Sequence, residues 1–200
     1  IVRNTGHVEL ARTLRDQTGA VLNIDDSLNL SGDNPGLSVS ANDLAALMYT
    51  SGSTGTPKAV MRAHRDFLHL CDTFAHKRGL TPADKASLVH SLSFGSAYSD
   101  LLPTLLNGAA LLPLDLKAES MHHFASWLRE EQITVCHLPP LAFRQLAPCL
   151  NGQNPLPHLR LLCLSGAPVT RLDFNLYTQH IAPGTALEIV MGSTETCSVA

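Results

Sequence analysis

The sequence predicts an α/β fold of layered sheets with flanking helices, and three observations carry this prediction. Of the 200 residues, 44% are hydrophobic and 16% are charged, with a formal net charge of −3, which is typical of a globular chain. Short apolar runs alternate along the chain with segments of helical period, the pattern of a parallel or mixed sheet. A chain of this length buries roughly 70% of its unfolded surface, enough for one core without disulfides.

Four segments carry helix signals. The first covers 8–18 and is stopped by Gly19. The second begins near His64 and places apolar residues along one face: Phe67, Leu70, Cys71 and Phe74. It ends with two cations and a glycine, as helices favour: Lys77, Arg78 and Gly79. Ser120 and Thr170 can cap a third and a fourth helix, the latter running to about 180.

The apolar runs between these segments predict strands that are mostly buried. They cover 20–24, 44–49, 87–92, 109–114, 134–137, 159–164 and 186–190. The stretch 26–42 is rich in Ser, Asn, Gly, Asp and Pro and is the best candidate for a surface loop or linker. Because ligands of open α/β sheets bind where loops leave the carboxyl ends of strands, three loops stand out. These are 50–57, 93–99 and 191–196.

Charge and cysteine usage limit the possible partners and location. There are 14 Lys+Arg against 17 Asp+Glu with no basic cluster, which argues against a nucleic-acid surface and favours a small molecule or a protein as partner. The five cysteines are odd in number and form no C-x-x-C pair, which favours a reducing, cytoplasmic setting. No apolar run approaches the roughly 18 residues of a membrane span, so none is predicted.

The loop YTSGSTGTPK after the run 44–49 carries the strongest functional signal. Its hydroxyl side chains and glycine backbone can surround an anion, and Lys58 can supply a charge for phosphate oxygens. It is not a Walker A loop, because Gly52 and Gly55 are too close together and Lys58 precedes Ala59. The alternative is a flexible Ser/Gly turn, which the preceding strand and the lysine make less suitable.

The segment YTSGSTGTPKAV resembles the signature loop of adenylate-forming enzymes, the superfamily of acyl-CoA synthetases, luciferases and nonribosomal-peptide adenylation domains. Further similar motifs follow in the family's order: SLSFGSAYSDLLPTLLNGAAL, ITVCHLPP, LCLSGAPV and MGSTET. The resemblance covers about 43–200 and implies part of the large N-terminal domain of such an enzyme. It also implies reaction of a carboxylic acid with ATP and Mg²⁺ to give an acyl-adenylate and pyrophosphate, followed by transfer to a thiol.

The resemblance assigns roles to individual positions. It implies catalytic roles for Lys58, Thr194 and Glu195, with Glu195 as the magnesium ligand, a hard oxygen donor of the kind magnesium prefers. The implied nucleotide-binding positions are Thr50, Ser51, Gly52, Ser53, Thr54, Gly55, Lys58, Gly166, Ala167, Pro168, Met191, Gly192, Ser193 and Thr194. Met191 stands where most members of the family have a tyrosine.

The implied substrate pocket indicates an unusual acid. Its positions are Phe94, Gly95, Ser96, Ser99, His137, Cys163, Ser165, Val190 and Ser198. Amino-acid-activating members have an aspartate at the position of Gly95, where it pairs with the α-ammonium. A buried ammonium without a counter-charge is costly, so the predicted substrate lacks a free α-amino group, as fatty, aryl, hydroxy or keto acids do. His137 either pairs with a polar substrate group or is a strand histidine satisfied by backbone groups.

The motif phrasing favours an adenylation domain that loads the phosphopantetheine thiol of a carrier protein, with an acyl- or aryl-CoA ligase as the alternative. The family's ribose-binding aspartate, hinge and catalytic lysine lie downstream of the motif at Glu195. The chain begins with Ile1 and stops at Ala200. We therefore expect 1–200 to be a partial domain without the early N-terminal part and the C-terminal lid, weakly active alone. An inactive, truncated nucleotide-binding fragment is the alternative of another class.

Overall fold

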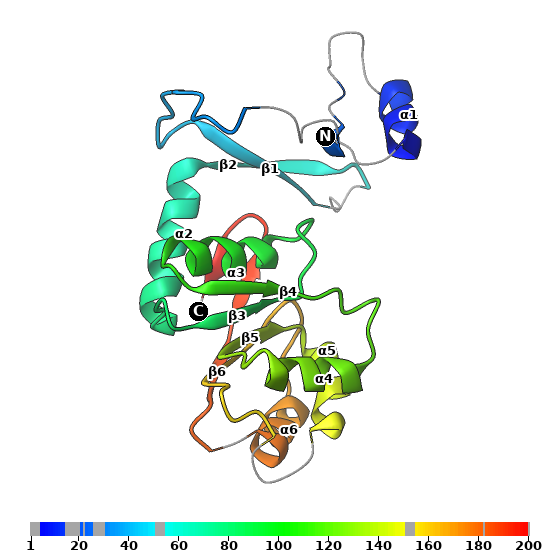
Figure 1. The fold of residues 1–200 in the computed structure, drawn as a ribbon, viewed down its shortest axis with the longest axis vertical. Coiled ribbons are helices and arrows are strands. Elements are labelled where there is room, and N and C mark those ends of the chain that lie inside the picture. Colours follow the sequence, from blue (N-terminus) through cyan, green and yellow to red (C-terminus); the bar gives the residue numbers. More distant parts are fainter. Residues whose placement is uncertain are drawn as a thin grey trace. The chain divides into compact units, whose positions relative to one another are not determined.

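The computed structural model describes residues 5–14, 21, 23–25, 31–50, 55–150, 155–181 and 183–199 (Figure 1). The chain divides into two compact units, 1–39 and 40–200. The first contains helix α1, Thr5–Leu14, which begins before the predicted helix 8–18 and overlaps it at 8–14, while 15–18 lie outside the described residues. In the predicted strand 20–24, residues 20 and 22 lie outside the described part, and 23–25 form an isolated bridge and a short 3₁₀ turn.

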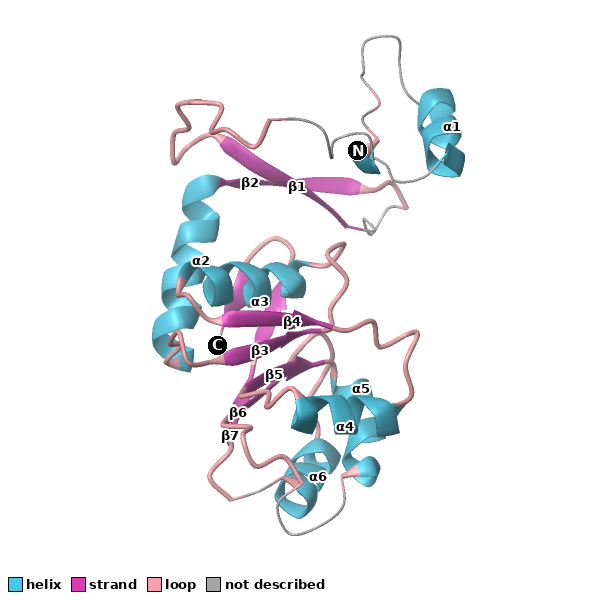
Figure 2. Ribbon diagram, in the orientation of Figure 1, coloured by secondary structure: helices cyan, strands magenta, loops and turns pink. Residues whose placement is uncertain are grey.

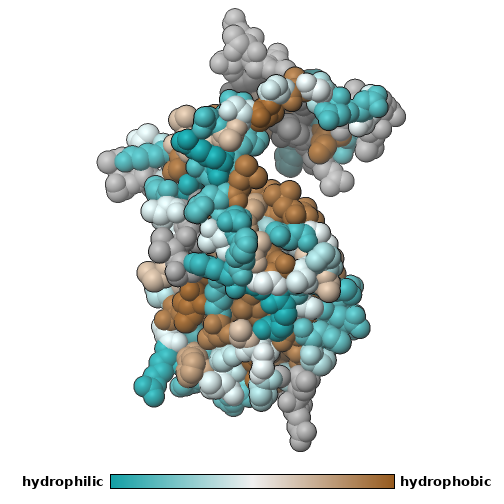
Figure 3. Space-filling view, turned by 90° about the vertical axis from the view of Figure 1, so that its left-hand side faces the viewer, coloured by the Kyte–Doolittle hydropathy of each residue, from teal (hydrophilic) through white to brown (hydrophobic). Residues whose placement is uncertain are grey.

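The second unit begins with an antiparallel hairpin. Strand β1, Leu44–Thr50, pairs with β2, Lys58–Ala63, and the register joins Thr50 to Lys58 across the phosphate-loop candidate. The predicted strand 44–49 is therefore confirmed in place, although it is not buried, because Leu47, Tyr49 and Met61 are exposed. Figure 3 shows hydrophobic residues at the surface in several groups separated by hydrophilic ones.

A five-stranded parallel sheet forms the centre of this unit, with strand order β4-β3-β5-β6-β7. Its strands are β3 Lys85–Leu88, β4 Ala110–Pro113, β5 Val135–Leu138, β6 Leu161–Leu164 and β7 Ala186–Ile189. Each strand overlaps a predicted apolar run. The strand predicted at 87–92 is β3, which begins earlier and ends at residue 88. Only the central β5 and β6 are buried along their whole length, whereas β4 and β7 are partly exposed.

Helices cover both faces of the sheet (Figure 2). On one face α2, His64–Arg78, packs with α3, Gly95–Leu106; on the other lie α4, Met121–Glu130, α5, Pro140–Leu146, and α6, Arg171–His180. A 3₁₀ turn, η2, Ala147–Cys149, follows α5. The predicted ends of three helices are confirmed, since Gly79 closes α2 with a φ of 56°, the Ser120 hydroxyl accepts from the His123 N–H at 3.2 Å, and Thr170 caps α6.

The period of two along β5 and β6 divides their side chains between two cores. Cys136, Leu138, Leu162 and Leu164 face α4–α6 and join the larger cluster around Phe124 and Phe143. Val135, Leu161 and Cys163 belong to a smaller cluster on the opposite face. By the same alternation, His137 lies on the face that α2 and α3 cover.

Two of the expected loops are wrong in part. Residues 95–99 of the expected loop 93–99 form the first turns of α3, and 191–196 form most of a small hairpin, β8 Met191–Ser193 with β9 Cys197–Val199. Strand β2 and helix α5 were not expected from the residues. In the described part of the chain, no helix is long and apolar enough to cross a membrane.

Candidate active site

A cavity of about 220 Å³ lies in the second unit at the carboxyl ends of β5, β6 and β7. Residues of the hairpin, of α2 and of the N-terminal part of α3 complete its wall. Its lining consists of Met48, Arg62, Phe67, Leu70, Phe94, Gly95, Ser96, Tyr98, Ser99, His137, Ser165, Gly166, Val190, Gly192, Ser193 and Thr194. Because the parallel strands end together here, residues far apart in the sequence meet at one site.

Most of the predicted pocket positions meet at this cavity. They are Phe94, Gly95, Ser96, Ser99, His137, Ser165 and Val190. A Cβ atom placed on Gly95 would meet nothing within 4 Å, so the absence of a side chain leaves open space there. Cys163 is not in the lining: it is buried behind it and its Sγ donates to Glu188 Oε2 at 3.0 Å. The side chain of Ser198 lies outside the described part of the structure.

The predicted nucleotide positions divide into four groups. Gly166, Gly192, Ser193 and Thr194 line the cavity. Ala167, Pro168 and Met191 are exposed, and Thr50, Gly55 and Lys58 belong to the β1–β2 hairpin, where the Thr50 hydroxyl donates to the Lys58 carbonyl oxygen at 3.5 Å. Ser51, Gly52, Ser53 and Thr54 lie outside the described residues.

Glu195 is exposed in the turn of the β8–β9 hairpin. Hydrogen bonds from its own backbone N–H and from the Ser193 hydroxyl lower the pKa of its carboxyl, and the positive charges of Arg62 and Lys58 add to this effect. An ionised, accessible carboxylate fits the oxygen donor that magnesium requires.

Arg62 is a site residue that sequence reasoning missed. It is 9% exposed on β2, and its Nη2 donates to the Thr194 carbonyl oxygen. Its Nε is buried without a hydrogen-bond partner among the described residues. Arg62 therefore links the strand after the phosphate loop to the turn that carries Thr194 and Glu195. The available signal was an arginine among the otherwise apolar residues 59–63 of β2.

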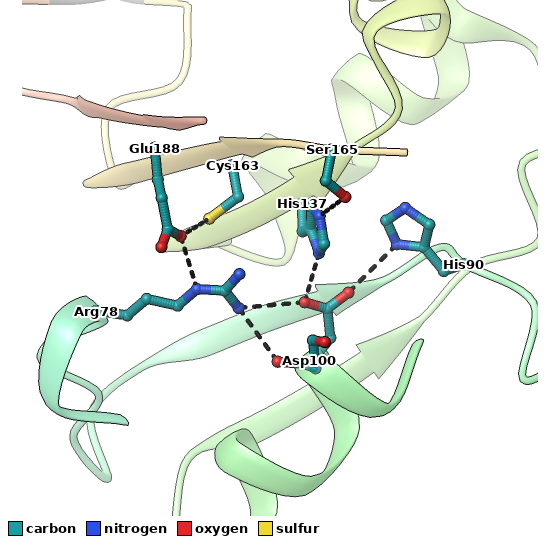
Figure 4. A network of polar contacts seen from close by, with 8 residues as sticks. Arg78, His90, Asp100, His137, Cys163, Ser165 and Glu188 are labelled. Atoms are coloured by element: carbon teal, nitrogen blue, oxygen red, sulfur yellow. Dashed lines mark hydrogen bonds and ion pairs between the residues drawn. The ribbon is translucent and has the colours of Figure 1, made fainter. Parts of the chain in front are cut away.

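A buried polar network lies behind the cavity wall (Figure 4). Its centre is Asp100 of α3, which receives His137 Nδ1 at 2.7 Å, His90 Nδ1 at 3.3 Å and Arg78 Nη1 at 3.3 Å. His137 Nε2 lies 2.6 Å from Ser165 Oγ, and Arg78 Nε donates to Glu188 Oε2 at 2.8 Å. His137 is therefore satisfied by side chains rather than by backbone groups.

The network fixes the charge of its members. Burial alone would raise the pKa of Asp100, but His137, His90 and Arg78 together hold that pKa well below its usual range. Burial, with the nearby charges of His90 and Arg78, lowers the pKa of His137 despite the opposing effect of Asp100. Asp100 is thus an ionised acceptor and His137 a neutral imidazole at pH 7.

The same network contains a set of possible metal ligands. Ligand atoms of His90, Asp100 and His137 all lie within 4.8 Å of one another. However, Arg78 occupies the same carboxylate oxygen as His137, and the 2.7 Å contact between His137 and Asp100 leaves no space for an ion between them. This cluster is better suited to hydrogen bonding than to holding a cation.

Comparisons with known proteins agree with the geometry. The family described as AMP-binding enzyme matches residues 5–200. Tyrocidine synthase 2 of Brevibacillus parabrevis is 35% identical over 164 residues, which is 80% of this chain and 4% of that protein. Bacitracin synthase 3 of Bacillus licheniformis is 32% identical over 172 residues, 82% of this chain and 3% of that protein. The chain thus spans only a small part of these relatives.

Solved structures give the same result. The AMPPNP-bound form of the nonribosomal peptide synthetase FmoA3 superposes with a TM-score of 0.77 at 26% identity, covering 88% of this chain and 19% of that chain. The chain therefore belongs to the adenylate-forming AMP-binding enzyme family, with peptide-synthetase adenylation domains among its relatives.

Proposed function

We propose that the protein containing this chain activates a carboxylic acid with ATP and Mg²⁺, releases pyrophosphate, and passes the acyl group to the phosphopantetheine thiol of a carrier protein. The main support is the cavity itself, in which the predicted acid-pocket residues Gly95 and His137 share one wall with Gly192 and Thr194 of the glutamate turn. The relatives named above are peptide synthetases, and FmoA3 binds the ATP analogue AMPPNP.

In adenylate formation the protein mainly has to position the reacting groups and stabilise negative charge. The acid's carboxylate oxygen forms a bond to the α-phosphorus as the bond to the leaving pyrophosphate breaks. Lys58 and the loop 50–55 are assigned to the pyrophosphate, and the Thr194 hydroxyl to the α-phosphate. Glu195 would hold Mg²⁺, which supplies positive charge where negative groups approach each other. Arg62 holds the backbone of the same turn through the Thr194 carbonyl.

The lining of the cavity supports a preference for an acid without a free α-amino group. Among the described residues that line the cavity, Arg62 is the charged one, and none carries a carboxylate. A substrate ammonium entering this space would lose its water without gaining a counter-ion. An acid bearing hydrogen, hydroxyl, keto or aryl groups at that position avoids the cost.

Acid-dependent ATP–pyrophosphate exchange tests this function. The full-length protein that contains this chain, called the parent protein below, is assayed with matched pairs of amino acids and their des-amino analogues. We expect exchange with des-amino members only. Exchange with amino acids at equal or higher rate would contradict the substrate assignment, and no exchange with a broad panel would favour the inactive fragment.

Gly95→Asp gives a sharper test. The open space at Gly95 accepts the new side chain, which supplies the missing counter-charge, so exchange with amino acids relative to their des-amino analogues should rise by about tenfold or more. Gly32→Asp is the matched control, because a Cβ there also meets nothing within 4 Å and Gly32 does not line the cavity. An unchanged ratio in Gly95→Asp would argue that the amine is not read at this position.

The alternative is an acyl- or aryl-CoA ligase. The acceptor distinguishes the two, because the adenylate is common to both. A carrier protein with its serine downstream in the same reading frame, loaded faster than free CoA, would support the carrier assignment. Faster transfer to free CoA would reverse it.

A further inference from the structure

Ser165 and His137 form a connected, buried pair in the cavity wall. Ser165 is 7% exposed, His137 is 1% exposed, and both line the cavity. Ser165 follows β6 directly, and His137 lies on the neighbouring strand β5, so the parallel pairing holds the two side chains together. Figure 4 shows His137 between the Ser165 hydroxyl and the carboxylate of Asp100.

The hydrogen atoms in the hydrogen bonds that join Asp100, His137 and Ser165 can be placed by elimination. The Asp100 carboxylate is an acceptor only, so His137 must donate from Nδ1 across the 2.7 Å contact. Because burial keeps His137 neutral, its Nε2 carries no hydrogen and accepts. The partner at 2.6 Å is the Ser165 hydroxyl, which therefore donates its only hydrogen to His137. Toward the cavity, Ser165 Oγ therefore offers only lone pairs and can only accept a hydrogen bond.

We propose that Ser165, oriented by His137 and Asp100, is a specificity-determining acceptor that selects acids carrying a hydrogen-bond donor, a hydroxyl or an N–H, at the position that meets it. This inference rests on the proposed function and narrows its substrate class. An ether or methyl group at the same position would leave the lone pairs of the Ser165 oxygen without a donor, a cost that rejects analogues more strongly than a missing contact in an apolar pocket does. His137 and Asp100 are positioning residues.

A Ser–His–Asp order is also the arrangement of acyl-transfer nucleophiles. Here the backbone N–H of Ser165 already donates to the Leu138 carbonyl oxygen at 3.2 Å. This N–H is therefore not free to stabilise an oxyanion that formed beside the Ser165 hydroxyl. The geometry is better suited to binding than to covalent attack.

The test uses three acids that differ at one position: a hydroxyl, its methyl ether, and a methyl group. In exchange assays with the parent protein, kcat/KM should favour the hydroxy acid by about tenfold over both others, the range of one neutral hydrogen bond in a buried site. Ser165→Ala should remove most of this preference, and Ser165→Thr, which keeps a hydroxyl, should restore it. Ser87→Ala is the matched control, a buried serine of the same sheet that does not line the cavity.

The results that would overturn this inference differ from those that would overturn the proposed function. Exchange without a hydroxyl-over-ether preference, or a preference that survives Ser165→Ala, overturns the inference while leaving acid activation intact. If no acid supports exchange, ¹⁵N resonances of His137 in the same protein still decide the direction of the hydrogen bond. A neutral ring with hydrogen on Nδ1 supports the inference. Hydrogen on Nε2 at pH 7 overturns it, because Ser165 would then present its own hydrogen to the cavity.

Discussion

Single residues decide how the two ends of the candidate site are connected, and Arg62 is the clearest case. Its guanidinium is buried and donates to the carbonyl of Thr194, one residue before Glu195. It also contributes positive charge that lowers the pKa of the Glu195 carboxyl. The residue thus joins the hairpin of Lys58 to the turn proposed to hold Mg²⁺.

Arg62→Met should therefore weaken use of MgATP. The methionine fills similar volume but offers neither a donor to Thr194 nor a charge, and a hydrogen bond from a charged donor contributes about 1.5–3 kcal/mol. We expect KM for MgATP in the exchange assay of the parent protein to rise by about tenfold or more. A KM for MgATP within twofold of that of the unchanged protein would mean that the turn of Thr194 and Glu195 keeps its conformation without Arg62.

The sequence predicted the residues of the cavity better than the contacts behind them. Gly95, His137 and Ser165 lie in contiguous motifs that resemble those of adenylate-forming enzymes, and each motif can be recognised from neighbouring residues alone. Arg62 and Asp100 are charged residues whose burial depends on partners far along the chain, as Asp100 depends on His137, 37 residues later. The spacing of residues in the sequence does not predict such a long-range polar pair, because the two residues meet only once the chain has folded.

At the scale of elements, helices with ordinary capping signals were predictable and those with unusual composition were not. Helix α3 begins at Gly95 and contains Pro103, both poor helix formers, and α5 begins with Pro140 at its first position. Tertiary packing outweighs propensity in both, since Ala97 and Phe143 are fully buried. The small β8–β9 hairpin is built from Gly, Ser and Thr, which resemble a loop in composition.

Helix α6 offers a test of one such cap. Asp173 is fully buried, accepts from the Thr170 N–H at 2.7 Å and hydroxyl at 2.9 Å, and pairs with Arg144 of α5 through bonds of 2.7 and 2.8 Å. The hydrogen bonds from Arg144, more than the opposing effect of burial, lower the pKa of Asp173 to about 2 from 3.8. Asp173→Asn should lower the free energy of unfolding by about 2 kcal/mol, since it weakens a cap and an ion pair together.

The pH dependence of the same carboxylate has a definite sign. Because its pKa is depressed in the folded state, its stabilisation is fully present above pH 3.8 and is lost as the pH falls through about 2. Urea unfolding at pH 6 and at pH 3 measures this. The difference in stability between the original chain and Asp173→Asn should be smaller at pH 3. Asn175→Ala, exposed on the same helix, is the control and should change stability little at either pH.

Across the whole second unit, one buried cation holds three elements together. Arg78, at the end of α2, pairs with Asp100 of α3 and with Glu188 of β7, and its guanidinium lies 4.3 Å from the centroid of the Phe74 ring. The larger core around Phe124 is on the opposite face of the sheet and is apolar. The face that carries the candidate site is instead fixed by charge, which allows polar groups such as His137 to be buried beside the cavity.

Arg78→Met should therefore destabilise the chain strongly. Removing the cation leaves the carboxylates of Asp100 and Glu188 without their shared partner, and breaking such a buried pair costs about 3–5 kcal/mol. Urea unfolding at pH 7 measures this loss. Arg12→Met is the contrast, because the Arg12–Glu9 pair is exposed and should contribute less than about 1 kcal/mol. Equal losses for the two variants would mean that packing rather than charge holds the site-bearing face.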